Sequence, residues 1–140
     1  MKHVTLFLSI LALLFTSATC QSQENKKGVD QALNSPKVSV YYFHFTQRCA
    51  TCKAVEENAR NAVEALYPGE VKAGEYSFSA LNLDDEDSRK IADKLGVGGQ
   101  TLLVVCGDKK VDITSSGFLN AHDPEKMQQE IKSAVDKVLD

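Results

Sequence analysis

Several features are absent from this sequence, and each absence excludes a class of protein. The most apolar segment, residues 4–15, is too short to cross a bilayer, which needs about 20 apolar residues. No cluster of basic residues occurs and the formal net charge is −3, so nothing points to a nucleic-acid partner. There is also no fingerprint for a flavin or nicotinamide cofactor, no internal repeat and no low-complexity segment.

Cysteine and proline are scarce, with four cysteines and three prolines among 140 residues. Residues 69–123 contain no proline. One cysteine belongs to the N-terminal segment, which leaves three for the rest of the chain: Cys49, Cys52 and Cys106. An odd number argues against a framework of structural disulfides, so one redox pair and one further thiol is the simpler interpretation.

The N-terminus has the pattern of an export signal. Lys2 and His3 begin it, the apolar segment follows, and small residues lead to Cys20. We therefore predict a signal peptide over residues 1–20 and an exported protein in the periplasm of a bacterial envelope, where disulfides persist. Either signal peptidase cuts after Ala18 or Cys20, or Cys20 is lipidated and tethers a lipoprotein to the membrane.

The remaining chain is long enough for one domain with a single core. Residues 21–36 are polar and are predicted to form a linker, and residues 37–140 are predicted to form the domain. The nearly continuous apolar character of residues 38–45 is typical of a central strand covered on both faces. Three more strands are expected at 76–83, 101–106 and 111–114, and three helices starting near Cys49, Asp84 and Asp123.

Turn-forming residues set the expected boundaries. Pro68-Gly69 is predicted to end the first helix, with a loop over residues 71–74. Residues 107–110 are expected to form a hairpin turn, and residues 115–122 a connection to the last helix. The order β-α-β-α-β-β-α predicts an α/β fold with a mixed four-stranded sheet flanked by helices, in which the first two strands are parallel.

The segment Cys49-Ala50-Thr51-Cys52 lies where the first strand turns into the first helix. Unpaired backbone N–H groups and the helix dipole favour negative charge at a helix N-terminus, and the thiolate is the nucleophile in disulfide exchange. Cys49 is therefore predicted to be an exposed nucleophile and Cys52 the resolving thiol, and the two would form a reversible disulfide. Arg48 is a candidate for stabilising the thiolate or an anionic substrate.

Metal binding is the competing interpretation of a C-x-x-C pair. A structural zinc site needs four ligands, and only His44, His122 and Cys106 could complete it. Cys106 should lie about 17 Å from Thr101 along the third strand, at about 3.3 Å per residue, and is expected to be a small buried residue. Haem attachment is excluded because Lys53 follows the pair. Two thiolates can still hold Cu(I) or As(III) with few other ligands.

The order of elements, the strand-Cys49-x-x-Cys52-helix unit and the approach to the third strand resemble thioredoxin-fold proteins over residues 37–139. This resemblance implies a thioredoxin-like fold and disulfide exchange at the two cysteines. More narrowly, residues 40–53, VYYFHFTQRCATCK, are similar to exported thioredoxin-like proteins called nitrophenyl compound nitroreductase subunit, ArsF family. That family implies a redox subunit that works beside an efflux permease in the reduction of nitro groups on aromatic arsenicals.

The sequence departs from ordinary thioredoxins, whose active site is Trp-Cys-Gly-Pro-Cys. Arg48 replaces the aromatic residue and residues 50–51 replace Gly-Pro, so thioredoxin's reducing potential does not carry over. The cis-proline that faces the disulfide in thioredoxins is missing, and Gln100 or Thr101 takes its place. The carboxylate that assists proton transfer at the second cysteine is replaced by Phe43.

These observations predict an exported thiol–disulfide oxidoreductase that passes electrons to a protein partner, either a reductase or a membrane protein such as a permease. We expect a monomer with no resident metal and no cofactor beyond its dithiol. One alternative is a carrier that binds Cu(I) or As(III) through the same two thiols. Another is a noncatalytic interaction domain in which the disulfide between Cys49 and Cys52 is structural.

Overall fold

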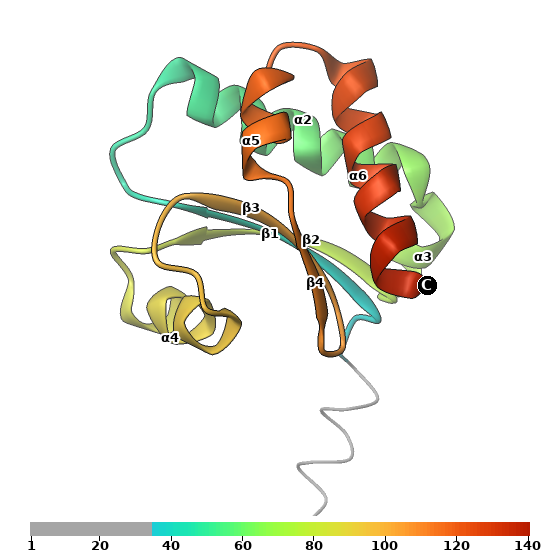
Figure 1. The fold of residues 1–140 in the computed structure, drawn as a ribbon, viewed down its shortest axis with the longest axis horizontal. Helices are drawn as coiled ribbons and strands as arrows, with labels where there is room; N and C mark the ends of the chain where they lie inside the picture. The colour runs from blue at the N-terminus through green and yellow to red at the C-terminus, as the bar shows by residue number, and fades with distance from the viewer. Residues whose placement is uncertain (1–34) are drawn as a thin grey trace, which may run out of the picture.

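The computed structural model describes residues 35–140 (Figure 1). The predicted signal peptide over residues 1–20, the lipidation of Cys20 and nearly all of the predicted linker over residues 21–36 lie outside the described residues. The regular elements run from Val38 to Leu139. Within this part of the chain, every helix is too short or too polar to cross a membrane.

A four-stranded mixed sheet forms the centre of the fold, as the sequence predicts (Figure 1). Strand β1 is parallel to β2, with helix α2 as their crossover, whereas β3 is antiparallel to β1 and β4 is antiparallel to β3. The central position of β1 explains its apolar sequence, because all its residues except Tyr41 are buried. The order across the sheet is β2 (Tyr76–Asn82), β1 (Val38–His44), β3 (Thr101–Cys106) and β4 (Lys109–Asp112).

Helices cover both faces of this sheet (Figure 1). On one face α2 (Ala50–Leu66) packs against α6 (Pro124–Leu139), accompanied by two shorter helices, and α4 (Glu86–Leu95) covers the other face. The predicted start of α6 is confirmed, because the Asp123 carboxylate accepts a hydrogen bond from the Lys126 N–H at 3.1 Å. The apolar side predicted for α6 is buried: Met127, Ile131, Ala134, Val135 and Val138.

Two separate cores follow from the alternation of side chains along β1. Tyr42 faces the larger core, which lies between the sheet and the helices α2 and α6. Phe43 faces the opposite side and packs with Leu83, Ala92 and Leu103 in the smaller core beneath α4. Helix α2 carries the dithiol. Tyr42, and not Phe43, therefore lies on the dithiol side of the sheet.

Two short helices correct the sequence-based expectation. Helix α3 (Pro68–Lys72) replaces the loop expected after α2, because a proline in the first turn of a helix has no N–H that needs a partner. Helix α5 (Thr114–Leu119) occupies most of the expected connection after β4. Asp112 supports its first turn by accepting a hydrogen bond from the Thr114 N–H at 2.8 Å. Longer helices are predicted from the periodic spacing of apolar residues. The proline that starts α3 and the Asp112 hydrogen bond that starts α5 are not part of such a pattern.

The hairpin between β3 and β4 is also tighter than expected. Lys109 and Lys110 already pair with β3, so the turn is limited to Gly107 and Asp108. Gly107 has a φ of 58°, a left-handed conformation that glycine adopts without steric cost.

Candidate active site: a dithiol at the start of helix α2

The loop between β1 and α2 is held in place by the end of β2. The Thr46 backbone N–H donates to the Asp84 carboxylate at 2.8 Å, and the Asn82 side-chain amide donates to the Thr46 hydroxyl at 2.9 Å. The Thr46 contacts, first from its hydroxyl and then from its backbone N–H, hold the pKa of Asp84 below its ordinary value. The loop that delivers the first cysteine to the helix start is therefore tied to the parallel strand next to β1.

Cys49 is the N-cap residue of α2, and Cys52 lies in the first turn. The Cys49 sulfur accepts a hydrogen bond from the Cys52 backbone N–H at 3.2 Å, which is the capping role that serine or aspartate plays in other helices. Cys49 is exposed, whereas Cys52 is only 8% exposed, and both are free thiols. This geometry gives the pair one accessible sulfur, stabilised by a helix N-terminus, and one sheltered sulfur behind it.

The two thiols interact with each other. The pKa of Cys52 is lowered, first by a side-chain hydrogen bond with Cys49 and next by one with Gln100, while burial acts in the opposite direction. The contributions of Cys49 and Gln100 both favour the thiolate form of Cys52.

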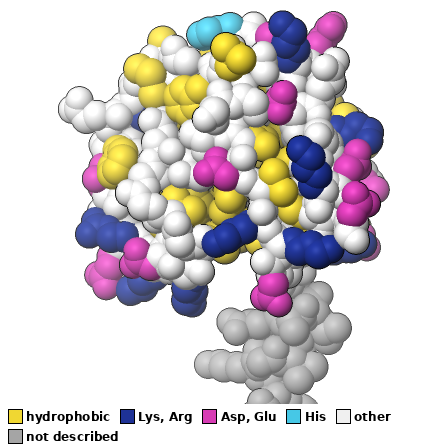
Figure 2. Space-filling model, in the orientation of Figure 1, with side chains coloured by type: hydrophobic (Ala, Val, Ile, Leu, Met, Phe, Trp, Pro, Cys, Tyr) yellow, Lys and Arg dark blue, Asp and Glu magenta, His cyan; other side chains and the backbone are white. Residues whose placement is uncertain are grey.

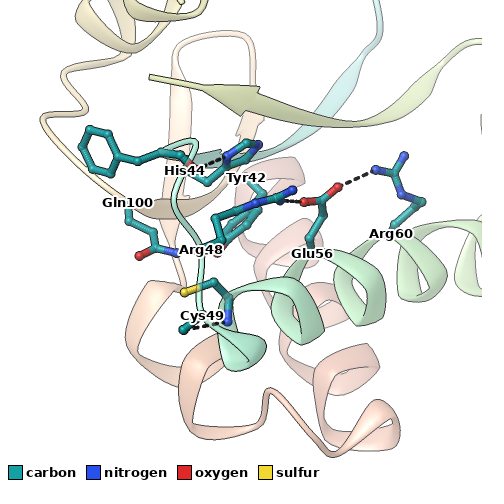
Figure 3. A network of polar contacts seen from close by, with 9 residues as sticks. Tyr42, His44, Arg48, Cys49, Glu56, Arg60 and Gln100 are labelled. Carbon is teal, nitrogen blue, oxygen red and sulfur yellow. Dashed lines mark hydrogen bonds and ion pairs between the residues drawn. The ribbon is translucent and has the colours of Figure 1, made fainter. Parts of the chain in front are cut away.

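Gln100 reaches the dithiol from the turn that precedes β3. Its amide nitrogen donates to the hydroxyl of Tyr42 at 2.5 Å (Figure 3). Tyr42 is fully buried, and burial raises its pKa to about 12, so its phenol stays protonated. The long-range pairing of β1 with β3 brings these two residues to the same side of the sheet as Cys52.

The side chains of Thr101 and Phe43 make other contacts. The Thr101 hydroxyl donates to the Gly99 carbonyl at 3.0 Å, and Thr101 lines a separate groove with Gly98 and Lys110. Phe43, at the position that holds a carboxylate in ordinary thioredoxins, packs into the smaller core. Of the two residues expected in place of the cis-proline, Gln100 therefore contacts the dithiol region, and the described residues contain no cis peptide bond.

Arg48 is held by charge pairing at the start of α2. Its guanidinium forms an ion pair with Glu56, whose other carboxylate oxygen lies 3.1 Å from Arg60 (Figure 3). The Arg60 guanidinium also stacks over the ring of Phe78, 4.8 Å from its centroid. Two cations thus share one carboxylate at the start of α2, which leaves a net positive charge in this network.

The other possible metal ligands do not complete a metal site with the dithiol within the described residues. His44 is buried, its Nδ1 lies 2.9 Å from the Phe45 carbonyl oxygen, and its ring stacks 5.8 Å from that of Tyr42. Cys106 pairs with Lys109 at the opposite end of β3 and packs against the larger core. Within residues 35–140, no three histidine, cysteine or acidic side chains come close enough together to hold a metal ion.

Two residues of this site were missed at the level of sequence. Tyr42 sits in an apolar strand, where its ring predicts packing and its hydroxyl carries no positional signal. Glu56 precedes Arg60 by one helical turn, a spacing that indicates an ion pair but gives no hint that Arg48 joins it.

The described domain resembles solved structures of thioredoxin-fold proteins. The zinc-bound form of human ERp44 matches with a TM-score of 0.52 and 14% identity, over 77% of this chain and 29% of that one. Thioredoxin of Malassezia sympodialis, Mala s 13, matches with a TM-score of 0.50 and 18% identity, over 75% and 82% of the two chains. This chain therefore has a thioredoxin-like fold, although it spans less than a third of ERp44.

Sequence comparison adds no closer relative. A scan against family models finds no match, and a search of curated proteins finds none either. The narrower resemblance to the ArsF family therefore rests on residues 40–53 alone.

Proposed function

We propose that this chain is an exported thiol–disulfide oxidoreductase that carries electrons on Cys49 and Cys52. The observation that supports this most strongly is the unequal placement of the two sulfurs. Cys49 is exposed and caps a helix, and Cys52 is sheltered within hydrogen-bonding reach of it. A purely structural disulfide needs no exposed sulfur and no stabilisation of a thiolate.

The dithiol reduces a disulfide in two steps. The Cys49 thiolate attacks one sulfur of the acceptor disulfide, so a mixed disulfide forms and one acceptor thiolate leaves. Cys52 then attacks the Cys49 sulfur, closes the bond between the two cysteines and releases the second acceptor thiolate. Two electrons pass to the acceptor, and its two sulfurs take up protons from solvent. A partner reductase must later return two electrons to this disulfide.

The proposed acceptor is a protein partner, either a reductase or a membrane permease. Phe45, in the loop four residues before Cys49, is 44% exposed and offers an apolar contact to a partner. Figure 2 shows acidic and basic side chains interspersed over the visible face, without a large area of one sign. The similarity of residues 40–53 to the ArsF family supports a redox subunit for nitro-group reduction on aromatic arsenicals, with the reducing cofactor on the partner.

The decisive experiment measures the reduction potential of the Cys49–Cys52 couple, by equilibration in glutathione or dithiothreitol buffers followed by mass-shift alkylation. A value near about −270 mV would mark a protein that delivers electrons and would support the proposed function. A value near about −120 mV would mark an oxidant that installs disulfides and would remove the basis for a reductase subunit.

A variant pair tests the assignment of the nucleophile. Cys49→Ser should abolish electron transfer to a model disulfide such as insulin or oxidised glutathione. Cys106→Ser should retain it, because Cys106 lies at the other end of the sheet. Full transfer by Cys49→Ser would contradict the proposed function.

Soft-metal carriage is a second candidate, favoured by the same two closely spaced sulfurs. Two thiolates are sufficient for Cu(I), and they also bind As(III). One equivalent of Cu(I) or As(III) should then protect both Cys49 and Cys52 from alkylation in the Cys106→Ser variant. Unprotected thiols in the presence of either ion would eliminate this candidate.

A further inference from the structure

Tyr42 and Gln100 are 58 residues apart in the chain, yet their side chains meet (Figure 3). Tyr42 projects from β1 and is fully buried, whereas Gln100 comes from the turn before β3 and is half-buried. The Gln100 amide nitrogen donates to the Tyr42 hydroxyl oxygen at 2.5 Å. The Gln100 side chain also helps to lower the pKa of the Cys52 thiol, by hydrogen bonding. An amide nitrogen carries two hydrogens, so one can serve each acceptor.

The orientation of this amide decides its effect on a thiolate. Its NH₂ end stabilises a negative sulfur, whereas its carbonyl oxygen would repel one. Figure 3 shows the Gln100 nitrogen turned toward Tyr42 and the oxygen turned away. Because the Tyr42 hydroxyl accepts from that nitrogen, it holds the favourable end of the amide in place.

We propose that Tyr42 is a positioning residue, which fixes the Gln100 amide so that its N–H group stabilises the thiolate of Cys52, the resolving cysteine. This inference rests on the proposed oxidoreductase function and assigns the resolving step to specific residues. Phe43 occupies the place of the carboxylate that would otherwise accept the Cys52 proton, and it faces the smaller core. Here the Cys52 proton is lost to solvent beforehand, and the stabilised thiolate attacks the Cys49 sulfur without a nearby base.

The other titratable groups around Cys52 have to be held constant in a test. Cys49 lies closest and shares a hydrogen bond with it. His44 stacks on the Tyr42 ring, and Arg48 is paired with Glu56 next to the helix start. A Cys49→Ala background removes the coupled thiol and leaves the other three groups unchanged.

The test is the pH dependence of Cys52 alkylation, read by peptide mass spectrometry in the full chain carrying Cys49→Ala. Gln100→Leu should raise the midpoint by about one pH unit, equivalent to a roughly tenfold smaller thiolate fraction at low pH. Tyr42→Phe should shift it in the same direction. The double variant should shift it no further than Gln100→Leu alone, because Tyr42 acts through Gln100.

A matched control comes from the neighbouring residue. Tyr41→Phe removes the same hydroxyl on the opposite side of β1 and should leave the midpoint unchanged. An unchanged midpoint in Tyr42→Phe, or additive shifts in the double variant, would overturn the positioning role. A lower unfolding temperature for Tyr42→Phe without a midpoint shift would make Tyr42 merely structural. If Tyr42→Phe does not fold, Gln100→Asn gives the test. The shorter asparagine side chain cannot reach both Tyr42 and Cys52, so this variant should also raise the pH midpoint of Cys52 alkylation.

The outcome does not depend on turnover, because the Cys49→Ala background cannot exchange disulfides. A protein without oxidoreductase activity could still show the predicted shifts, and an active one could lack them. The positioning role of Tyr42 and the proposed function are therefore tested separately.

Discussion

At the scale of single residues, the two cysteines differ in surroundings although only two residues separate them. The Cys49 sulfur stands at the open end of α2 and accepts a backbone hydrogen bond. The Cys52 sulfur is sheltered, and its pKa is lowered by Cys49 and by Gln100. This difference assigns the attack on the acceptor to one sulfur and the closing step to the other, and the local sequence of the pair explains only the first of these environments.

Arg48 belongs to an ion-pair network that its position in the sequence does not reveal. A cation in front of a C-x-x-C pair indicates a free charge that could meet an anionic substrate. Its ion pair with Glu56, which Arg60 shares, instead makes it part of a fixed network at the helix start. Its role toward a thiolate or an anionic substrate stays a prediction.

The anchor between Thr46 and Asp84 predicts a pH-dependent stability. The hydrogen bonds from Thr46 lower the folded-state pKa of Asp84 below its ordinary value of 3.8. The stabilisation is therefore complete above pH 3.8 and is lost as the pH falls through the folded-state value. Asp84→Asn should be less stable than the parent at neutral pH, and this difference should vanish in acid. Urea unfolding at several pH values measures it.

The control for this anchor is an acidic residue of similar exposure. Asp108 lies in the turn between β3 and β4, far along the chain from Thr46. The difference in unfolding free energy between Asp108→Asn and the parent should be the same at neutral and at acid pH. A difference between parent and Asp84→Asn that persists unchanged below the folded-state pKa would contradict the anchor.

At the scale of elements, the short helix α5 depends on its contact with the sheet. It has six residues, too few to be stable alone, and it lies against Leu102 through Gly117. Gly117 is buried, and a Cβ there would lie 2.8 Å from Leu102 Cδ2. Leu102 is itself fully buried, so it has little room to move aside.

Gly117→Ala should therefore destabilise the protein by about 1–3 kcal/mol, the usual cost of overpacking a core. Chemical denaturation measures the free energy of unfolding. Gly69→Ala is the matched control, because nothing lies within 4 Å of a Cβ at that position. Its stability should stay within about 0.5 kcal/mol of the parent, as for ordinary surface substitutions. Equal effects for the two variants would show that α5 is not closely packed.

At the scale of the whole molecule, the sheet separates the third thiol from the dithiol. Thr101 begins β3 at the dithiol end, and Cys106 finishes it at the other, about 17 Å away at about 3.3 Å per residue. Residues whose Cα atoms are more than about 7 Å apart cannot form a disulfide without backbone movement. Among the three cysteines that the structure describes, any disulfide within one folded molecule must therefore join Cys49 to Cys52.

Mild oxidation of the reduced protein should accordingly leave Cys106 free. Peptide mapping after alkylation should find labelled Cys106 and a disulfide between Cys49 and Cys52. The Cys106→Ser variant should oxidise at the same rate as the parent. An intramolecular disulfide between Cys106 and either of the other two cysteines would contradict the observed strand order.

The sequence by itself determined the features that depend on neighbours along the chain. Apolar periodicity identified β1, β3 and the buried side of α6, and the C-x-x-C segment marked the junction of β1 and α2. These predictions succeeded because strand and helix periods, caps and breakers act within a few residues. The short helices α3 and α5 escaped prediction because neither contains a full period of apolar residues.

Only the tertiary structure decided which distant residues serve the dithiol. The pairing of β1 with β3 brings Gln100 to Tyr42, and the parallel pairing of β1 with β2 brings Asp84 to Thr46. Alternation along β1 then places Tyr42 rather than Phe43 on the dithiol side. The physical reason is that strand register is set by the whole core, since a slip of one residue would exchange the buried faces.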